Sequence, residues 1–176
     1  HLQSAPLTTV VMEAAEPHLD RGKQVHFEEG PAPGHDGPQP VILRRPEVVH
    51  GLRNLIQNAV DFARATVWVE TRWSGDRITI RIMDDGPGYP PHLFGRIGDP
   101  FMRHPGDARP GYDGMGLGLF IAKTLLERSG ATLTFSNRGT IGKSGAEVEV
   151  SWPSGALVSD DGTTRAALGP NTEIRV

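Results

Sequence analysis

Two asparagines, Asn54 and Asn58, stand four residues apart in a stretch with a helical pattern of apolar residues. Residues four apart on a helix are surface neighbours, so we expect the two carboxamides to lie side by side. Asparagine is a poor helix former, and a solvated helix face more often carries Lys and Glu. A carboxamide oxygen can occupy one position around Mg²⁺ when phosphates and water supply the others. The pair indicates either such a site or two solvent-facing side chains, and by itself favours neither.

A second group of residues could bind a base. Asp84, Asp85, Gly86, Pro87 and Gly88 directly follow a predicted strand. An acid at a strand end places a hydrogen-bond acceptor over a sharp turn, and glycines allow a ligand to approach the backbone closely. The exocyclic amine of adenine is a donor that Asp84 could satisfy. The same five residues are also a common turn sequence, so the alternative is a purely structural turn.

A third group could bind phosphates. It consists of alternating glycines just before a predicted helix: Gly114, Met115, Gly116, Leu117, Gly118 and Leu119. Glycines leave room for backbone N–H groups to converge, and a helix N-terminus adds partial positive charge. No Gly-Lys-Ser/Thr follows, so this is not a Walker A loop, and the glycine spacing does not match a dinucleotide fingerprint.

The elements that must position these groups follow from periodicity. The asparagines lie on a helix predicted over 46–64, with Pro46 in its first turn. Its apolar stripe should face a sheet: Val48, Leu52, Leu55, Ala59 and Ala63. Its polar residues lie opposite or beside that stripe: His50, Asn54, Gln57, Asn58 and Asp61.

Two more helices are predicted, over 5–22 and 119–129. Strands are predicted over 23–29, 66–73, 77–83, 132–135 and 146–152, and proline and glycine indicate loops over 30–40 and 86–118. This order predicts an α/β (α+β) two-layer sandwich, in which helices pack on one face of a mixed, mostly antiparallel sheet. We expect one domain over 1–153 and an extension of unassigned structure over 154–176.

Composition excludes several classes of protein. The chain has 176 residues, a net charge of −3 and no cysteine. Disulfide scaffolds, thiolate zinc sites and cysteine nucleophiles are therefore excluded. The charge argues against a protein whose affinity comes from neutralising nucleic-acid phosphates. No apolar run approaches the ~20 residues that a membrane-spanning helix needs, so we expect no membrane contact by this segment.

All three groups together resemble the catalytic, ATP-binding domain of bacterial sensor histidine kinases, in the GHKL (Bergerat-fold) ATPase superfamily. The matching motifs occur in family order over residues 40–150: His50-x-x-x-Asn54-Leu55-x-x-Asn58-Ala59, Asp84-x-Gly86-x-Gly88, Asp99-Pro100-Phe101, and Gly114-x-Gly116-x-Gly118-Leu119. Gly142 with Gly145-Ala146 is a weaker match to a final glycine motif. Residues 97–130 are further similar to redox-responsive proteobacterial kinases of the RegB/PrrB kind.

The resemblance implies a role for each matching residue. Asn58 would bind Mg²⁺ and Asn54 would lie on the ATP phosphates, and these two are the expected catalytic residues. Asp84 would accept the adenine amine, with Gly86 and Gly88 bordering the base. The second glycine group, from Gly114 to Leu119 and including Met115 and Leu117, would wrap the phosphates. His50 and Asp61 complete the polar face of the helix as residues lining the ATP site; for His50 the alternative is a purely structural hydrogen bond.

The resemblance also implies that residues 89–113 form a lid over ATP. Cations in this lid could reach the γ-phosphate: Arg96, Arg103, His104 and Arg109. Many relatives carry Lys and Tyr where this chain has Asp61 and Phe62, so a phosphate counter-charge is missing here. We expect Arg103 or Arg109 to supply it; solvated loop charges are the alternative.

No histidine of this chain lies in the acceptor motif of the family, which resembles His-Glu-x-x-x-Pro. We therefore expect the acceptor on a dimerisation domain outside the chain, and a response regulator as an indirect partner. Related hydrolases carry a glutamate base where this chain has Asn54, which cannot accept a proton at neutral pH. An ATP hydrolase, or a regulatory module that binds nucleotide without transferring phosphate, stays the alternative. The implied location is cytoplasmic, as part of a membrane-anchored sensor.

Overall fold

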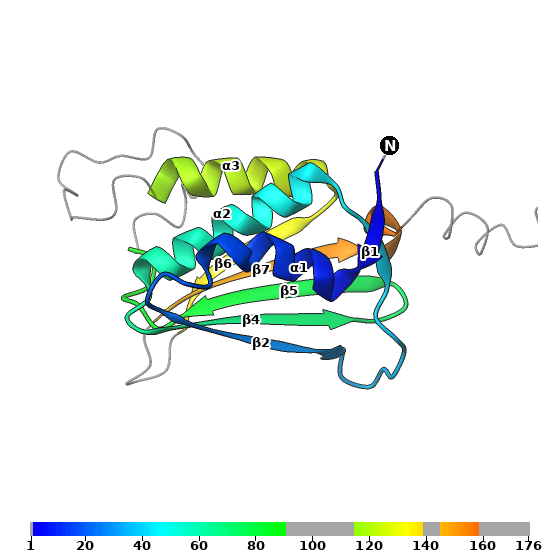
Figure 1. Ribbon diagram of the computed structural model, residues 1–176, viewed down its shortest axis with the longest axis horizontal. Helices are drawn as coiled ribbons and strands as arrows, with labels where there is room; N and C mark the ends of the chain where they lie inside the picture. Colours follow the sequence, from blue (N-terminus) through cyan, green and yellow to red (C-terminus); the bar gives the residue numbers. More distant parts are fainter. Residues whose placement is uncertain (1, 91–114, 139–144, 159–176) are drawn as a thin grey trace, which may run out of the picture.

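Five strands form one sheet in the order β2-β4-β5-β7-β6 (Figure 1). A computed structural model describes residues 2–90, 115–138 and 145–158 of the chain. The strands are β2 (Gln24–Pro31), β4 (Thr66–Trp73), β5 (Arg77–Asp84), β6 (Thr132–Asn137) and β7 (Ala146–Pro153). β2 runs parallel to β4, whereas the other neighbours in the sheet are antiparallel.

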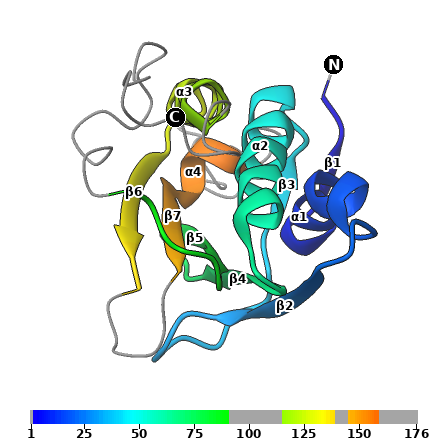
Figure 2. The ribbon, with the colours of Figure 1, turned by 90° about the vertical axis from the view of Figure 1, so that its left-hand side faces the viewer.

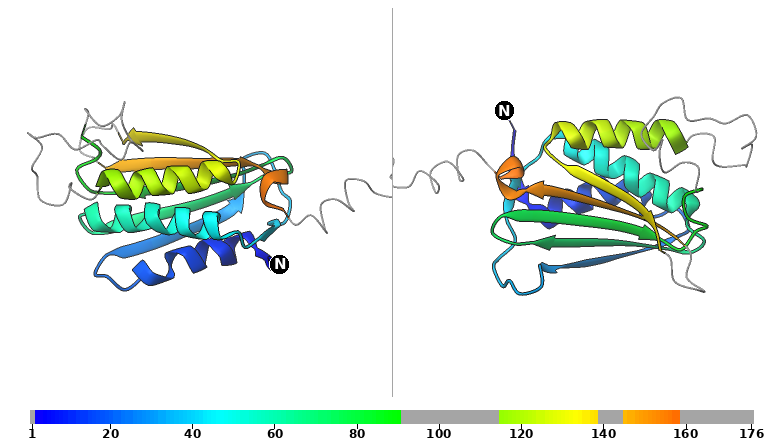
Figure 3. Two further views of the ribbon diagram at one scale, coloured as in Figure 1. Left: turned by 90° about the horizontal axis from the view of Figure 1, so that it is seen from above. Right: turned by 180° about the vertical axis from the view of Figure 1, so that it is seen from behind.

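Helices α1 (Leu7–Ala15), α2 (Pro46–Phe62) and α3 (Met115–Arg128) lie side by side over one face of this sheet (Figure 3). The two-layer fold with a mixed, mostly antiparallel sheet is therefore confirmed. None of the helices in the described ranges is long and apolar enough to cross a bilayer.

The core lies between the helices and the sheet. Side chains alternate along a strand, and most of those that point toward the helices are apolar and buried, including Val67, Val69, Ile78, Ile80, Ile82, Val148 and Val150. The apolar stripe predicted on α2 is buried in full. Burial of this stripe leaves the opposite, polar face of α2 directed away from the sheet.

Helix α2 is fixed between its two neighbours (Figure 2). On the α3 side, Gly51 lies so close to Leu126 that any Cβ would collide with the leucine side chain. On the α1 side, Arg53 donates to the carbonyls of Glu13 (3.0 Å) and Ala14 (3.2 Å) at the end of α1. The side chains on the polar face of α2 are therefore held on a rigid element.

The helix predicted over 5–22 is wrong at both ends. Ala5 pairs with Ile42 in a small antiparallel sheet of β1 (Ser4–Pro6) and β3 (Val41–Leu43), and β3 was not predicted. At the other end, α1 stops at Ala15 and a 3-10 turn, η1, spans Glu16–His18. Pro17 explains this end, because proline lacks the N–H and clashes with the preceding turn.

Two further differences from prediction concern the start of α3 and the segment after β7. Helix α3 begins at Met115, so Gly116 and Gly118 lie in its first turn rather than before it. In a helix, each glycine is about 1 kcal/mol less favourable than alanine. Tertiary packing outweighs that cost at the start of α3. After β7, the short helix α4 (Ser154–Leu157) buries Leu157, and Val158 forms a bridge with Ile42. Residues 159–176 lie outside the described part of the chain.

Candidate functional site

Three chain segments end or begin at the same end of the molecule. The last residue of β5 is Asp84, the last of α2 is Phe62 and the first of α3 is Met115. All three ends lie together on the left of Figure 1. The asparagine, first glycine and second glycine motifs are therefore brought to one end of the fold, although they are separated in sequence.

Asp84 is a buried carboxylate, only 3% exposed. Its Oδ1 accepts the backbone N–H groups of Gly86 (2.8 Å) and Ala146 (3.3 Å). Burial raises the pKa of Asp84, and these two hydrogen bonds only partly oppose that effect. The turn thus fixes a desolvated acceptor, which can recognise a hydrogen-bond donor with high selectivity.

Glycine is required on both sides of Asp84. A Cβ at Gly86 would overlap the carbonyl oxygen of Phe62, at the end of α2. A Cβ at Gly145, whose φ is +150°, would overlap the carbonyl oxygen of Asp84 itself. Because these neighbours are backbone atoms, they cannot move aside as a flexible side chain could. The weakly matching final glycine motif therefore lies in the site through Gly145, whereas Gly142 is outside the described residues.

The chain after Asp84 is held by a residue that no sequence motif marked. Asn137, at the end of β6, accepts the N–H of Tyr89 (2.6 Å) and donates to the Tyr89 carbonyl (2.8 Å). Gly88, with φ +83°, lies against the same Asn137 side chain. The Tyr89 ring meets Phe135 edge-on, with centroids 5.8 Å apart. These contacts fix the path of the chain as it leaves the first glycine motif.

Asp85 has a different task from Asp84. Its Oδ1 accepts the N–H groups of Arg64 (2.7 Å), Ala65 (3.0 Å) and Thr66 (3.2 Å). Partial burial pushes the pKa of Asp85 upward, but the backbone hydrogen bonds outweigh it and hold this pKa below the ordinary value. Asp85 thereby fastens the connection between α2 and β4 to the turn that carries Asp84.

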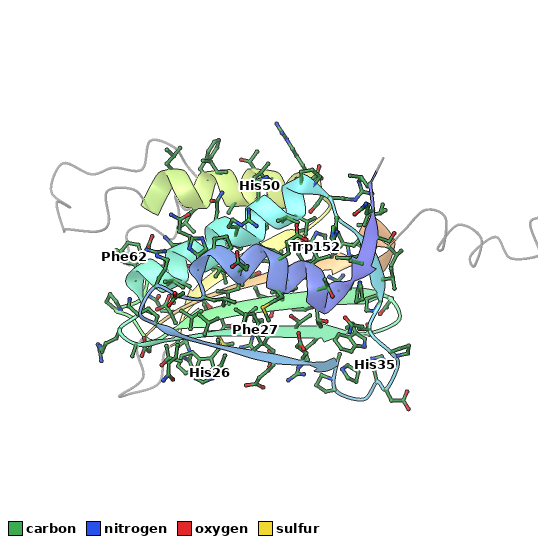
Figure 4. All side chains as sticks on the ribbon, viewed as in Figure 1. His26, Phe27, His35, His50, Phe62 and Trp152 are labelled. Atoms are coloured by element: carbon green, nitrogen blue, oxygen red, sulfur yellow. The ribbon has the colours of Figure 1, made fainter. Side chains whose placement is uncertain are left out.

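The polar face of α2 carries the predicted amides in order. Asn54 and Asn58 are half-buried, whereas His50 is exposed. Figure 4 shows His50 and Phe62 toward opposite ends of the helix. His50 lines an open depression near the start of α2 together with Glu13, Arg44 and Arg53, among other residues. His50 is therefore separated from the end of α2 that meets Asp84.

Asp61 lies one residue before the end of α2, and its Oδ1 accepts a hydrogen bond from Arg21 at 2.6 Å. This ion pair joins the polar face of α2 to the connection between η1 and β2, and no sequence motif predicts it.

The first turn of α3 contains the described part of the second glycine motif. Leu119 is fully buried in the core, whereas Leu117 is 58% exposed. Apart from its chain neighbours and the nearby helix backbone, no atom of the described residues lies within 4 Å of the position that a Cβ would take at Gly118. The first N–H groups of a helix have no partner within it and can bind an anion. Gly114 and the predicted lid cations Arg103 and Arg109 lie outside the described residues, and the side chain of Met115 is not described.

The side chains of this site suit a metal ion that is bound mainly by substrate phosphates and water. Within residues 2–90, 115–138 and 145–158, no three His, Asp or Glu side chains form a group that could hold a metal ion. Mg²⁺ commonly binds through substrate phosphates, water and one or two protein oxygens rather than in an all-protein cage. The amide of Asn58 fits that mode.

Comparison with known proteins decides the family. The family model of the histidine kinase-, DNA gyrase B- and HSP90-like ATPases matches residues 44–156. The chain belongs to this family. The ATPase domain is 58% identical, over 187 aligned positions, to the sensor histidine kinase RegB of Cereibacter sphaeroides. That alignment covers 99% of this chain but only 40% of the relative, so the chain spans about two fifths of the length of its relative.

Solved structures show the same fold. The mycobacterial sensor histidine kinase MprB matches this ATPase domain with a TM-score of 0.65 at 20% identity, covering 87% of this chain and 97% of that one. Full-length ShkA, solved in complex with AMPPNP, matches with a TM-score of 0.65 at 25% identity, covering 90% of this chain and 32% of that one.

Proposed function

We propose that this chain is the ATP-binding catalytic domain of a two-component sensor histidine kinase. It transfers the γ-phosphate of ATP to a histidine on the dimerisation domain of its parent kinase, and a response regulator receives the phosphate afterwards. The observation that carries the proposal is the buried Asp84, held in a glycine-built turn against the end of the asparagine helix. The 58% identity to a sensor kinase supports kinase over other members of the family. Because ATP is the phosphate donor, we place the reaction in the cytoplasm.

ATP lies between the turn after β5 and the polar face of α2. Its adenine amine donates to Asp84, with Gly86 and Gly88 along the edge of the base. Its phosphates extend toward Asn54 and Asn58, and the first turn of α3 offers backbone N–H groups to them. The Asp84 carboxylate supports this orientation because it is an acceptor in a place where water is excluded.

Asn58 would hold Mg²⁺ through its amide oxygen. When bound, the metal neutralises charge that develops on the transferring phosphoryl group. Asn54 orients the phosphates from one helical turn away. In the reaction, an unprotonated imidazole nitrogen attacks the γ-phosphorus and a P–N bond forms. The bond between the γ-phosphorus and the β,γ-bridging oxygen breaks, and ADP leaves with that oxygen and its electron pair.

Transfer is favoured over hydrolysis by the chemistry of Asn54. Activation of water needs a base, and the amide of asparagine cannot accept a proton at neutral pH. An imidazole needs no such base, because its attacking nitrogen carries a lone pair. Positioning and charge neutralisation are then sufficient for catalysis.

The test is a transfer assay in trans. The chain is mixed with Mg²⁺, γ-labelled ATP and the separately purified dimerisation domain of the parent kinase. We expect acid-labile, base-stable label on a histidine, loss of that label with Asn58→Ala, and retention with Gln57→Ala. Gln57 is the matched control because it is an exposed amide on the same helix.

The outcomes separate the alternatives. Release of free phosphate without labelled histidine would favour an ATP hydrolase. ATP binding without transfer or hydrolysis would favour a regulatory nucleotide-binding module. Either result would contradict the proposed transfer.

A further inference from the structure

Asp61 places a negative charge where the proposed function places phosphates. It lies three residues after Asn58, and residues three apart on a helix are surface neighbours. Its side chain is 37% exposed, so its charge is not hidden in the core. A carboxylate at this point would repel a polyphosphate unless a cation offsets it.

The offsetting cation comes from the connection between η1 and β2. The Nη2 of Arg21 donates to the Oδ1 of Asp61 at 2.6 Å, and its Nη1 lies 3.2 Å from the Nδ1 of His18. Lys23 fastens the same connection to the end of α2 by donating to the carbonyls of Val60 (2.8 Å) and Ala63 (2.5 Å). The guanidinium is therefore held against the last turn of α2 from two sides.

We propose that Arg21 masks the charge of Asp61 so that the triphosphate can bind beside it. Arg21 is thus a positioning residue of the nucleotide site, although it precedes the family-matched region of residues 44–156. This inference rests on the proposed function, because it needs phosphates next to Asn58. By this inference, the segment before α2 contributes to nucleotide binding in the ATPase domain.

The experiment is calorimetric titration of MgATP into the full chain at low ionic strength. Arg21→Ala should weaken MgATP binding about fivefold, as expected for one exposed charge close to a polyanion. Asp61→Asn leaves the Arg21 charge unopposed and should bind MgATP more tightly than wild type. The Arg21→Ala/Asp61→Asn double variant, which removes both charges, should return to within about twofold of wild type. Adenosine, which lacks phosphates, should bind all four proteins equally.

Matched variants test whether the effect of Arg21 on MgATP affinity comes from its positive charge. Arg77→Ala removes the same charge at the opposite end of β5 and should leave MgATP affinity unchanged, whereas Arg21→Lys should keep it near wild type. The loss in Arg21→Ala should also shrink at high salt. If Arg21→Ala does not fold, Arg21→Gln carries the same expectation, because it can still donate to Asp61 without a charge.

Two results would overturn the inference. One is an Arg21→Ala variant that binds MgATP as tightly as wild type. The other is a double variant as weak as Arg21→Ala, which would mean that Arg21 acts on the nucleotide without Asp61. In both cases the proposed function is still supported as long as the wild-type protein binds MgATP. Failure of the wild-type protein to bind MgATP would contradict the proposed function itself.

Discussion

The two ends of β5 look alike in sequence and differ in structure. Each is flanked by a turn that contains glycine and aspartate. At the start of the strand, the β4–β5 hairpin turns through Ser74–Asp76, with Ser74 Oγ donating to Asp76 (2.8 Å) and accepting the N–H of Arg77 (3.2 Å). Apart from its two chain neighbours, no atom in the described part of the chain lies within 4 Å of the position that a Cβ would take at Gly75.

At the end of the strand, the turn is crowded by other parts of the chain. Gly86 lies against the carbonyl of Phe62, and Gly145 lies against the carbonyl of Asp84. Asp84 is buried there, whereas Asp76 is fully exposed. The comparison shows that turn composition does not mark a site. Close backbone contacts between distant segments, around a buried carboxylate, do mark one.

The largest expected effect is that of Gly86→Ala. Its Cβ would overlap the Phe62 carbonyl, and backbone on both sides prevents relief, so we expect a loss of about 3 kcal/mol in the free energy of unfolding. Urea unfolding followed by circular dichroism measures this. A loss below about 1 kcal/mol would show that the end of α2 can move away, and the contrast between the two turns would fail.

Asp85→Ala should have a smaller effect, about 1 kcal/mol, because it removes hydrogen bonds to three backbone N–H groups that are exposed or only partly buried. The folded-state pKa of Asp85 is lowered from 3.8. Its stabilisation is therefore present above that value and is lost as pH falls through the folded-state pKa. Unfolding curves at neutral pH and in acid well below 3.8 should show the difference between wild type and variant shrink in acid. A constant difference would assign the effect to packing instead.

Gly75→Ala should have the smallest effect, under about 0.5 kcal/mol. Its backbone φ does not lie in the left-handed region, and nothing surrounds the new methyl group. The same urea series serves as the control for Gly86→Ala. Destabilisation comparable to that of Gly86→Ala would mean that any added Cβ after this strand or before it is harmful.

Much of this arrangement could be predicted from sequence because it depends on local patterns. Period-two alternation located β4 and β5, and the apolar stripe located α2 and its buried face. The order of the asparagine and glycine motifs predicted the family. These features are set by neighbouring residues, and the fold brings them to one end as expected.

The remainder depends on contacts that join distant segments. The pair between Arg21 and Asp61 spans forty residues, and the bonds between Tyr89 and Asn137 span forty-eight. No periodicity or motif records such contacts. The alternating glycines predict a loop before residue 119, whereas in the structure Gly116 and Gly118 lie in the first turn of α3.

The proposed function depends on recognition of the adenine of ATP by Asp84, and one titration tests this interaction. MgATP is titrated calorimetrically into wild type and into Asp84→Asn. Asparagine can keep one oxygen for Gly86 and Ala146 but then presents an N–H₂ donor to the adenine amine. The pKa of Asp84 is raised by burial, so its charged form lowers the stability of the folded protein at neutral pH, and this cost disappears in acid. Asp84→Asn carries no charge at this position, so it should melt no lower than wild type.

We expect one binding site in wild type and an affinity at least about thirtyfold weaker in Asp84→Asn, with its melting temperature retained. Equal affinities in the two folded proteins, or no heat of binding in wild type, would contradict the account.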